Sequence, residues 1–353
     1  MLKILLLADK FHANTLNFID ALEKTSMVDL EVLTFDINKA EKNSKFHLIM
    51  RLVAFVSIFY KIRLNIIKFK PDIILGYRTT SYGYIATRFY KQAKIVVAMQ
   101  GVSDIFPFDN WASPIKKRLQ YNTFKRASLI QAWGKTQQKN ALLNGADPNK
   151  LFVMPRGINL NYFKFGDQFA NVETMNWVVS RSLSIDYNHD LLIGSFSKFI
   201  KNNNRKHHLY IAGEGQLFSK LLLLVSELKI SDYVTFLGRI SNNELSELLS
   251  KSHIYVSLPV SEGVSASLLE AMACGCIPIV TDLPSNREWI ENQQNGILTK
   301  IDNEDIVVEN FEYLFDNLDT FIDARIQNRE IVELLGNQKI NTQAFIDEYL
   351  KLI

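Results

Sequence analysis

The sequence predicts an α/β protein built from two doubly wound domains, each around a parallel sheet. Short apolar, β-rich runs alternate with helical patterns along the chain, which is typical of βαβ units with helices on both faces of a sheet. The alternation is interrupted at residues 160–176, where turn-forming and mixed polar residues gather. At 353 residues the chain also exceeds what one hydrophobic core usually supports. We therefore expect two domains with a linker at the interruption.

Six strands are expected in each half of the chain. In the first half they are KILLLA, DLEVLTF, PDIILG, KIVVAMQ, SLIQAW and LFVMP. In the second half they are WVVS, HLYIAGEG, YVTFLG, HIYVSL, CIPIVT and GILT. The last part of the chain, from about residue 319, is expected to be mostly helical. We predict a first domain at 1–165, a second at 166–334, and a C-terminal helix at 335–353 that crosses back to the first domain.

Composition indicates a soluble, cytoplasmic protein. Hydrophobic residues make up 47% of the chain and charged residues 22%, which is ordinary for a globular protein. No run reaches the roughly 20 apolar residues of a membrane span, and the apolar stretch in MLKILLLADKF is too short for a signal peptide. Cys274 and Cys276 are one residue apart, a spacing that suits neither a disulfide nor a zinc site.

Charge is unevenly distributed along the chain. Residues 1–165 contain 25 Lys and Arg against 11 Asp and Glu, or +14, and residues 166–353 contain 15 against 26, or −11. The basic half should be drawn to an anionic partner. Basic residues flank the apolar helical pattern at 45–70 and recur in SPIKKRL, which favours peripheral attachment to the inner face of the cell membrane. The alternative is a core helix with solvated ends. We see no nucleic-acid-binding motif and expect no nucleic acid partner.

The segments that follow the strands of the second domain should form a binding site. Ligands of open parallel sheets bind beyond the carboxyl ends of the strands. Here these positions offer glycines for close backbone approach, two arginines for a phosphate or a base, and a carboxylate. They are Arg181, the trio Gly213, Glu214 and Gly215, the pair Gly238 and Arg239, and residues 259–263.

The segment SEGVSASLLEAM carries the most specific signal. The helix after Gly263 begins with small residues, so its free N–H groups and its dipole can face an anion, and Arg181 would add fork donors for the same oxygens. Glu262 precedes this helix, whereas Glu270 looks in from its face. Since a carboxylate can accept both hydroxyls of a vicinal diol, the set fits a nucleotide-diphosphate sugar.

These residues resemble the E-x7-E signature of retaining nucleotide-sugar glycosyltransferases with the GT-B fold, a large family that builds bacterial cell-surface glycans. The resemblance extends through SRSL, IAGEG, VTFLGRISNNEL, IYVSLPVSEG and NGILT, and VMPRGINLNYF looks like the interdomain segment of the family. It implies two Rossmann-like domains facing across a cleft. It also implies a hexosyltransferase-type enzyme of capsule or lipopolysaccharide synthesis, whose acceptor is a glycan or a saccharide linked to a lipid diphosphate.

The resemblance further implies a front-face mechanism, in which the leaving phosphate takes the proton of the acceptor hydroxyl and no protein nucleophile is needed. Catalysis then depends on positioning and on stabilising the charge of the diphosphate. No D-x-D stands at a strand end, so we expect neither a metal nor a cofactor beyond the sugar nucleotide.

The resemblance assigns roles position by position. Glu270 would bind the ribose, Glu262 would lie beside the donor sugar, and Arg181 would neutralise the diphosphate. The remaining donor-binding positions are the N–H groups of Gly263, Val264 and Ser265, the loop of Gly213, Glu214 and Gly215, and the base-lining loop of Gly238, Arg239 and Ile240.

Two residues of the first domain are acceptor-side candidates. His12 lies in DKFHANT, after the first strand, where a lone histidine is more often solvated than ligand-binding. Asp104 lies in GVSDIF, at the carboxyl end of another strand, and is a candidate for contact with donor or acceptor and for catalysis.

One departure from the family pattern keeps a second function open. Many members carry a lysine about five residues after the arginine, but Asp186 stands at that spacing. Aligning the DLLI segment instead places Tyr187 at the lysine position and Ser182 at the arginine position. A catalytically silent sugar-nucleotide-binding subunit is therefore an alternative, as is an epimerase or phosphorylase with the GT-B fold.

Two other enzyme classes fit less well. A dinucleotide fingerprint in GEGQLF would need a glycine where Phe218 stands. A serine-hydrolase elbow in GVSAS would need a glycine where Ser267 stands.

Overall fold

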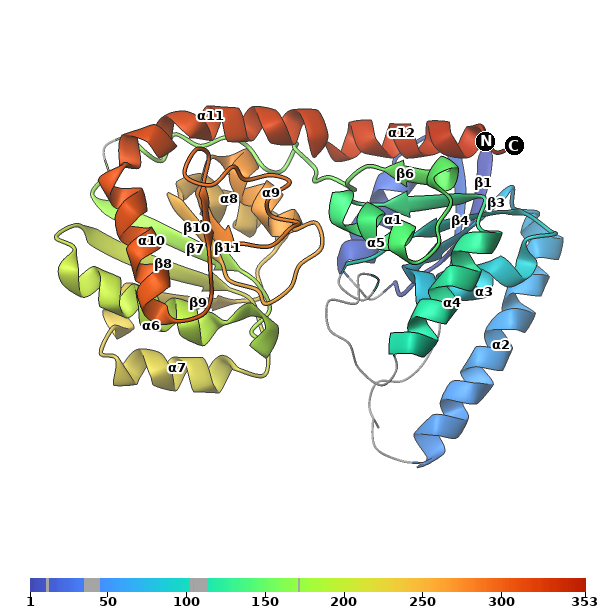
Figure 1. The fold of residues 1–353 in the computed structure, drawn as a ribbon, viewed down its shortest axis with the longest axis horizontal. Coiled ribbons are helices and arrows are strands. Elements are labelled where there is room, and N and C mark those ends of the chain that lie inside the picture. Colours follow the sequence, from blue (N-terminus) through green and yellow to red (C-terminus); the bar gives the residue numbers. More distant parts are fainter. Residues whose placement is uncertain (11–12, 35–44, 102–103, 105–112, 171) are drawn as a thin grey trace. The chain divides into compact units, whose positions relative to one another are not determined.

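The computed structural model describes residues 1–10, 13–34, 45–101, 104, 113–170 and 172–353. These residues form two compact units (Figure 1). The first unit comprises Met1–Arg156 together with Lys339–Ile353, and the second comprises Gly157–Gln338. Each unit has one six-stranded, parallel sheet, which confirms the predicted α/β fold.

The sheet of the first unit has the strand order β2-β1-β3-β4-β5-β6. Its central strands are buried along most of their length, as expected for continuous runs of Leu, Ile and Val covered on both faces. The strands are β1 (Leu2–Leu7), β2 (Val28–Leu33), β3 (Ile73–Tyr77), β4 (Lys94–Ala98), β5 (Leu129–Ala132) and β6 (Leu151–Val153). The α-helices are α1 (Ala13–Glu23), α2 (Lys45–Phe69), α3 (Gly83–Ala86), α4 (Ser113–Arg126), α5 (Lys135–Leu143) and, at the C-terminus, α12 (Gln338–Leu350).

The sheet of the second unit has the order β12-β11-β10-β7-β8-β9. The chain first winds outward through β8 and β9 and then returns to place β10 on the other side of β7, so the strand order reverses between β7 and β10. The strands are β7 (Thr174–Ser180), β8 (Lys206–Ala212), β9 (Val234–Gly238), β10 (Ile254–Ser257), β11 (Ile277–Thr281) and β12 (Ile297–Thr299). The helices are α6 (His189–Asn202), α7 (Phe218–Glu227), α8 (Asn242–Lys251), α9 (Ala266–Cys274), α10 (Glu304–Asp316) and α11 (Leu318–Leu335). Such a reversal is where doubly wound sheets bind ligands.

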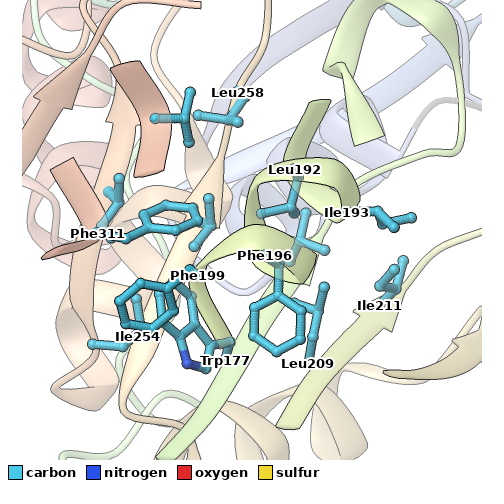
Figure 2. Close-up of a cluster of buried hydrophobic side chains, with 14 of the residues drawn as sticks. Trp177, Leu192, Ile193, Phe196, Phe199, Leu209, Ile211, Ile254, Leu258 and Phe311 are labelled. Carbon is cyan, nitrogen blue, oxygen red and sulfur yellow. The ribbon is translucent and has the colours of Figure 1, made fainter. Parts of the chain in front are cut away.

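Aromatic packing fixes one face of this second sheet. Figure 2 shows Trp177 of β7 among Phe196 and Phe199 of α6 and Phe311 of α10, with ring centroids 4.8 to 5.5 Å from that of the indole. Trp177 is fully buried, and its Nε1–H donates to Nδ1 of His207 at 3.1 Å. Because β7 and α6 are locked together in this way, the loop between them, residues 181–188, is held at both ends.

The expected linker is a folded part of the second unit. Gly157, at φ +76°, approaches α11 so closely that a Cβ there would lie 2.5 Å from the Gly336 carbonyl oxygen. Arg325 donates to the Gly166 carbonyl at 2.8 Å, and Arg329 donates to that of Phe163 at 2.6 Å. The turn-rich segment is therefore attached to the second unit, because arginine side chains of α11 donate hydrogen bonds to the carbonyl groups of this segment.

The observed unit boundaries differ from those predicted at 165/166 and 334/335. They fall at 156/157 and 338/339. The residues from Lys339 onward lie with the first unit, where Phe345 of α12 packs edge-on against Phe18 and Trp133. All twelve predicted strands are present. Within the residues that the structure describes, no helix is both long and apolar enough to cross a membrane.

Candidate active site

The candidate site lies where the strand order of the second unit reverses. Arg181 directly follows β7, and its Nε donates to the Ser257 hydroxyl at the end of β10 at 3.1 Å. Its Nη2 donates to the carboxylate of Glu262 and to the hydroxyl of Ser265. The side chains of Arg181 and Glu262 are 12% and 14% exposed. Two predicted site residues are thus joined in one largely buried ion pair.

The electrostatics of this pair keep the arginine charged. Burial is the largest single influence and would lower the pKa of Arg181, but the charge of Glu262, the nearby Tyr255 and Tyr187 and the hydrogen bond to Glu262 together raise it. The guanidinium carbon also lies 5.0 Å from the centroid of the Tyr187 ring, a cation–π arrangement. Burial raises the pKa of Tyr187, so its phenol stays neutral. Tyr187, at the aligned lysine position, therefore makes a cation–π contact with Arg181 and does not supply a second cation.

The N-terminus of α9 faces the same pair. Ser265 is the N-cap residue, and its side chain accepts a hydrogen bond from the Leu268 N–H at 3.3 Å. The N–H groups of Gly263, Val264 and Ser265 donate to no residue in the described part of the chain, although Gly263 and Ser265 are buried. Unpaired amides at a helix N-terminus suit an anion. The predicted amide cluster is therefore available for a phosphate.

The glycines after β8 hold the Arg181 loop in place. A Cβ on Gly213 would lie 1.9 Å from the Arg181 carbonyl oxygen, and one on Gly215 would lie 2.3 Å from that of Leu183. The Leu183 N–H donates to the Glu214 carbonyl at 2.9 Å. These glycines thus permit close backbone contact between the two loops. This positioning role is additional to the donor contact that the sequence predicts for them. The predicted base-lining residues follow the edge strand β9, where Arg239 is exposed and Ile240 is partly exposed.

Glu270 lies on α9, five residues after the N-cap, and is partly buried. Burial, followed by the charge of Glu270, raises the pKa of the Cys274 thiol to about 12. Both cysteines are buried and unlinked, as expected. Glu262 and Glu270 therefore stand before and within the first turns of the same helix, in the order that the sequence motif predicts.

Sequence reasoning missed several residues that shape this loop. His189, at the start of α6, is fully buried, with Nε2 3.0 Å from the Ser182 carbonyl oxygen. Burial lowers its pKa, so it is neutral. Asn188 donates from Nδ2 to the Leu258 carbonyl at 2.9 Å, and the Val260 N–H donates to the Asp186 carbonyl at 3.0 Å. The sequence signal that could have identified these residues is their position after the ends of β7 and β10.

Of the two first-domain candidates, the structure describes Asp104. Asp104 is fully buried, and its Oδ1 accepts from the Thr79 N–H at 3.1 Å and hydroxyl at 2.5 Å. Its Oδ2 accepts from the Gln100 N–H at 2.6 Å, and burial raises its pKa despite these bonds. With no exposed surface and three internal donors, this carboxylate holds Thr79 and Gln100 together, and its assignment to catalysis or acceptor contact stays a prediction. His12 lies outside the described residues.

Among the described residues, no group of three or more His, Cys, Asp or Glu side chains could hold a metal ion. The site therefore offers an ion pair, free backbone amides and a second carboxylate around one helix N-terminus. In a doubly wound unit, such an arrangement suits an anionic, nucleotide-like ligand.

Comparisons with known proteins agree with this class. Residues 168–328 match the family model described as "Glycosyl transferases group 1", and residues 3–132 match that described as "Glycosyl transferase 4-like". Over the full chain, the fold is similar to sucrose-phosphate synthase from Thermosynechococcus elongatus, with a TM-score of 0.83, 13% identity and 99% of that chain covered. It is also similar to Anabaena HepE in complex with UDP-glucose, with a TM-score of 0.77, 17% identity and both chains fully covered. The chain therefore has the fold of these glycosyltransferase-like structures, and its second unit is similar to the group 1 glycosyl transferases.

Two relatives in sequence carry named activities. An N-acetylgalactosamine-N,N'-diacetylbacillosaminyl-diphospho-undecaprenol 4-alpha-N-acetylgalactosaminyltransferase of Campylobacter jejuni is 25% identical over 268 residues, which are 74% of this chain and 72% of the relative. An O-antigen chain mannosyltransferase of Salmonella typhimurium is 30% identical over 148 residues, 39% of this chain and 41% of the relative. The match thus spans less than half of the second relative's length.

Proposed function

We propose that the protein is a retaining, metal-independent glycosyltransferase that uses a nucleotide-diphosphate sugar. Its acceptor would be a glycan or a saccharide linked to a lipid diphosphate, in the synthesis of a cell-surface polysaccharide. The observation that carries this proposal is the group formed by Arg181, Glu262 and the free amides of Gly263 to Ser265. It supplies donors for a diphosphate and an acceptor for sugar hydroxyls at one place.

In this proposal the donor lies across the N-terminus of α9. The free amides and Nη1 of Arg181, which donates to no described residue, would contact the diphosphate. Glu270 would accept the ribose hydroxyls, and Glu262 those of the transferred sugar. Since Glu262 is already held by Arg181, its carboxylate is oriented before the donor arrives, which reduces the reorganisation needed for transfer.

The transfer step would proceed on one face of the sugar. The acceptor oxygen forms a bond to the anomeric carbon while the bond from that carbon to the diphosphate oxygen breaks. The hydroxyl proton passes to the departing phosphate oxygen, so atoms and charge balance without a protein nucleophile. Arg181 and the amides would stabilise the charge that develops on the diphosphate, an effect of the oxyanion-hole type.

Relatives support the two substrates separately. The solved Anabaena structure contains UDP-glucose, which supports a nucleotide-sugar donor here. The Campylobacter relative is named for a diphospho-undecaprenol acceptor, which supports a lipid-diphosphate acceptor.

We also propose that the first unit rests on an anionic membrane surface. On α4, the apolar side chains of Ile115 and Tyr121 are 59% and 48% exposed, and on α2 those of Tyr60 and Ile67 are 66% and 69% exposed. Exposed basic residues accompany them, namely Lys116, Lys117, Arg118, Lys125 and Arg126 on α4 and Lys61, Arg63 and Lys68 on α2. Exposed apolar and basic groups together are typical of interfacial helices.

Vesicle flotation tests this attachment. At low salt the protein should float with vesicles containing phosphatidylglycerol and stay at the bottom with neutral phosphatidylcholine vesicles. Binding to neither kind of vesicle would contradict the attachment and leave the transferase proposal intact.

The experiment for the transferase itself combines binding with turnover. A thermal-shift panel of UDP-, GDP- and ADP-sugars identifies the donor, because a ligand that binds only the folded state raises its stability. The stabilising sugar nucleotide is then incubated with a lipid extract that contains diphosphate-linked saccharides. We expect a product whose anomeric configuration, measured by NMR, equals that of the donor. An inverted product would rule out the retaining mechanism.

A sugar-nucleotide-binding subunit without activity is the second candidate. The observation that favours it is that Tyr187 stands at the aligned lysine position. The second cation of the family pattern is therefore missing there, and Arg181 contacts Glu262 without it. Donor stabilisation in the thermal-shift panel, without hydrolysis or transfer with any lipid extract, would establish this alternative.

A further inference from the structure

Arg78 has an unusual backbone conformation at the carboxyl end of the first sheet. It directly follows β3 and has φ +75°, a region that residues with long side chains rarely adopt. It also begins a π-helical turn, Arg78–Tyr82. Both features are rare and occur preferentially at functional sites.

The surrounding structure holds this turn firmly. A Cβ on Gly83 would lie 2.6 Å from the Arg78 carbonyl oxygen, so the turn closes on a residue without a side chain. Beneath it, buried Asp104 accepts from both the N–H and the hydroxyl of Thr79, and Thr123 donates to the Thr79 carbonyl at 2.9 Å. A satisfied, buried polar network therefore maintains a strained arginine where glycine would be relaxed.

The side chain of Arg78 is held so that its end remains available. Its Nε donates to Oε1 of Gln100 at 2.8 Å, and the side chain is partly exposed. Its two Nη groups donate to no residue in the described part of the chain, and no described carboxylate lies within ion-pair distance of them. An oriented guanidinium with two free nitrogens matches the oxygens of a phosphate.

A second guanidinium converges on the same place. Tyr77, the last residue of β3, is buried, and its hydroxyl forms a hydrogen bond with Arg156. The charges of both Arg156 and Arg78 act on this hydroxyl, but burial raises the pKa of Tyr77, so the phenol stays neutral. Two positive charges thus act on a neutral group. The buried Asp104 carboxylate also interacts electrostatically with Arg78, but its hydrogen bonds are made with Thr79 and Gln100.

We propose that Arg78 and Arg156 form a binding subsite for a phosphate or diphosphate group, and that in the reaction this group belongs to the acceptor. The assignment to the acceptor rests on the proposed function, whereas the anion site itself does not. Arg78 would bind the anion through its two Nη groups, with Arg156 adding charge from the end of β6. The strained backbone is what directs Arg78 to this position.

Titration with inorganic pyrophosphate tests the anion site directly. The protein is titrated calorimetrically, first alone and then in the presence of the nucleotide that the thermal-shift panel selects, so that pyrophosphate bound in the second unit is distinguished from pyrophosphate bound at Arg78. The variants are Arg78→Asn, which removes the charge but tolerates a positive φ, and Arg156→Gln. The control is Arg88→Gln, because Arg88 is exposed in the same unit and stacks on Tyr84.

We expect the dissociation constant for pyrophosphate to rise at least about tenfold in Arg78→Asn and Arg156→Gln and to be unchanged in Arg88→Gln. The melting temperature of Arg78→Asn should equal or exceed that of the unmodified protein, because asparagine relieves strain at this position. Wild-type affinity in both variants would overturn the proposal. A clear loss of stability in Arg78→Asn with unchanged affinity for pyrophosphate would also overturn the proposal. In that case Arg78 would only stabilise the turn.

Steady-state kinetics assign the anion to the acceptor. With a lipid-diphosphate saccharide, KM for the acceptor should rise about tenfold in Arg78→Asn while KM for the sugar nucleotide stays unchanged. An alkyl glycoside acceptor without phosphate should show no difference between the two proteins. If pyrophosphate binding depends on Arg78 but acceptor KM does not, the site takes free phosphate and the assignment to the acceptor is wrong. If no acceptor is ever glycosylated while Arg78-dependent binding persists, the proposed function fails and the anion site stands.

Discussion

Arg181 links two parts of the site that are 81 residues apart in sequence. Of its donor nitrogens, Nε and Nη2 serve Ser257, Glu262 and Ser265, and Nη1 remains for a ligand. The residue therefore orients the Glu262 carboxylate and contributes charge at the same time. Removing it would leave a largely buried carboxylate without its partner, which is more damaging than losing a surface pair.

Arg181→Gln should lower kcat with the preferred sugar nucleotide by about 10² to 10³, as for loss of one charged group that stabilises a developing anion. The exposed Arg205 of the same unit provides a matched control, because Arg205→Gln changes the net charge equally without touching the ion pair. Initial rates at saturating substrates measure the effect. Equal rates in Arg181→Gln and Arg205→Gln would show that Arg181 does not assist transfer.

Glu270 provides a test of donor binding that is separate from turnover. In the proposed site its carboxylate accepts the ribose hydroxyls, and Glu270→Ala should therefore abolish most of the thermal stabilisation by the sugar nucleotide. Glu247→Ala, on the exposed side of α8, should keep the full stabilisation. Both are read as the shift in melting temperature at one donor concentration. An undiminished shift in Glu270→Ala would contradict the ribose role.

At the scale of elements, helix α9 carries the site at one end and is anchored at the other. Arg325 of α11 donates from Nε to the Gly275 carbonyl at 2.6 Å and from Nη2 to that of Gly166. Its guanidinium carbon lies 4.4 Å from the ring centroid of Phe169, and the residue is 5% exposed. A cation at a helix C-terminus also interacts favourably with the helix dipole. The position of α9 and of the candidate site at its N-terminus thus depends on an arginine outside the site.

Arg325→Ala should destabilise the protein by about 3 kcal/mol, because buried carbonyl groups lose charged donors and a cation–π contact is removed. Arg287 forms an ion pair with Asp282 but is 60% exposed, so Arg287→Ala should change stability much less. Urea unfolding followed by circular dichroism compares the two. Similar midpoints for both variants would mean that the Arg325 contacts are not important for stability.

The elements themselves were predictable, whereas their side-chain partners were not. Strand positions follow from short apolar runs, and the placement of Glu262 before α9 follows from the strand-loop-helix pattern. The ion pair of Arg181 with Glu262 and the burial of Asp104 depend on how loops distant in sequence meet, which periodicity does not encode. The segment at 160–176 was mistaken for a linker for the same reason, since its partners lie in α11.

At the scale of the whole molecule, buried histidines couple stability to pH. Burial lowers the pKa of His207 to about 4, with the charge of Arg205 adding to the effect, and burial also lowers those of His189 and His253. These groups are neutral in the folded state but take up protons in the unfolded chain below about pH 6.5. Stability is therefore complete above that pH and decreases as pH falls from about 6.5 toward 4.

The melting temperature should therefore fall by several degrees between pH 7.5 and pH 5, and His207→Asn should reduce this dependence. An asparagine Oδ1 can accept the Trp177 N–H as Nδ1 of His207 does, so the variant removes the titrating group while keeping the acceptor. Burial raises the pKa of Asp104, so this group changes stability with pH in the opposite direction to the histidines. Both proteins contain Asp104, and its effect therefore cancels when their melting temperatures are compared. Melting curves recorded by circular dichroism from pH 5 to pH 7.5 provide the measurement. If the difference in melting temperature between the two proteins is the same at every pH, His207 does not cause the acid sensitivity.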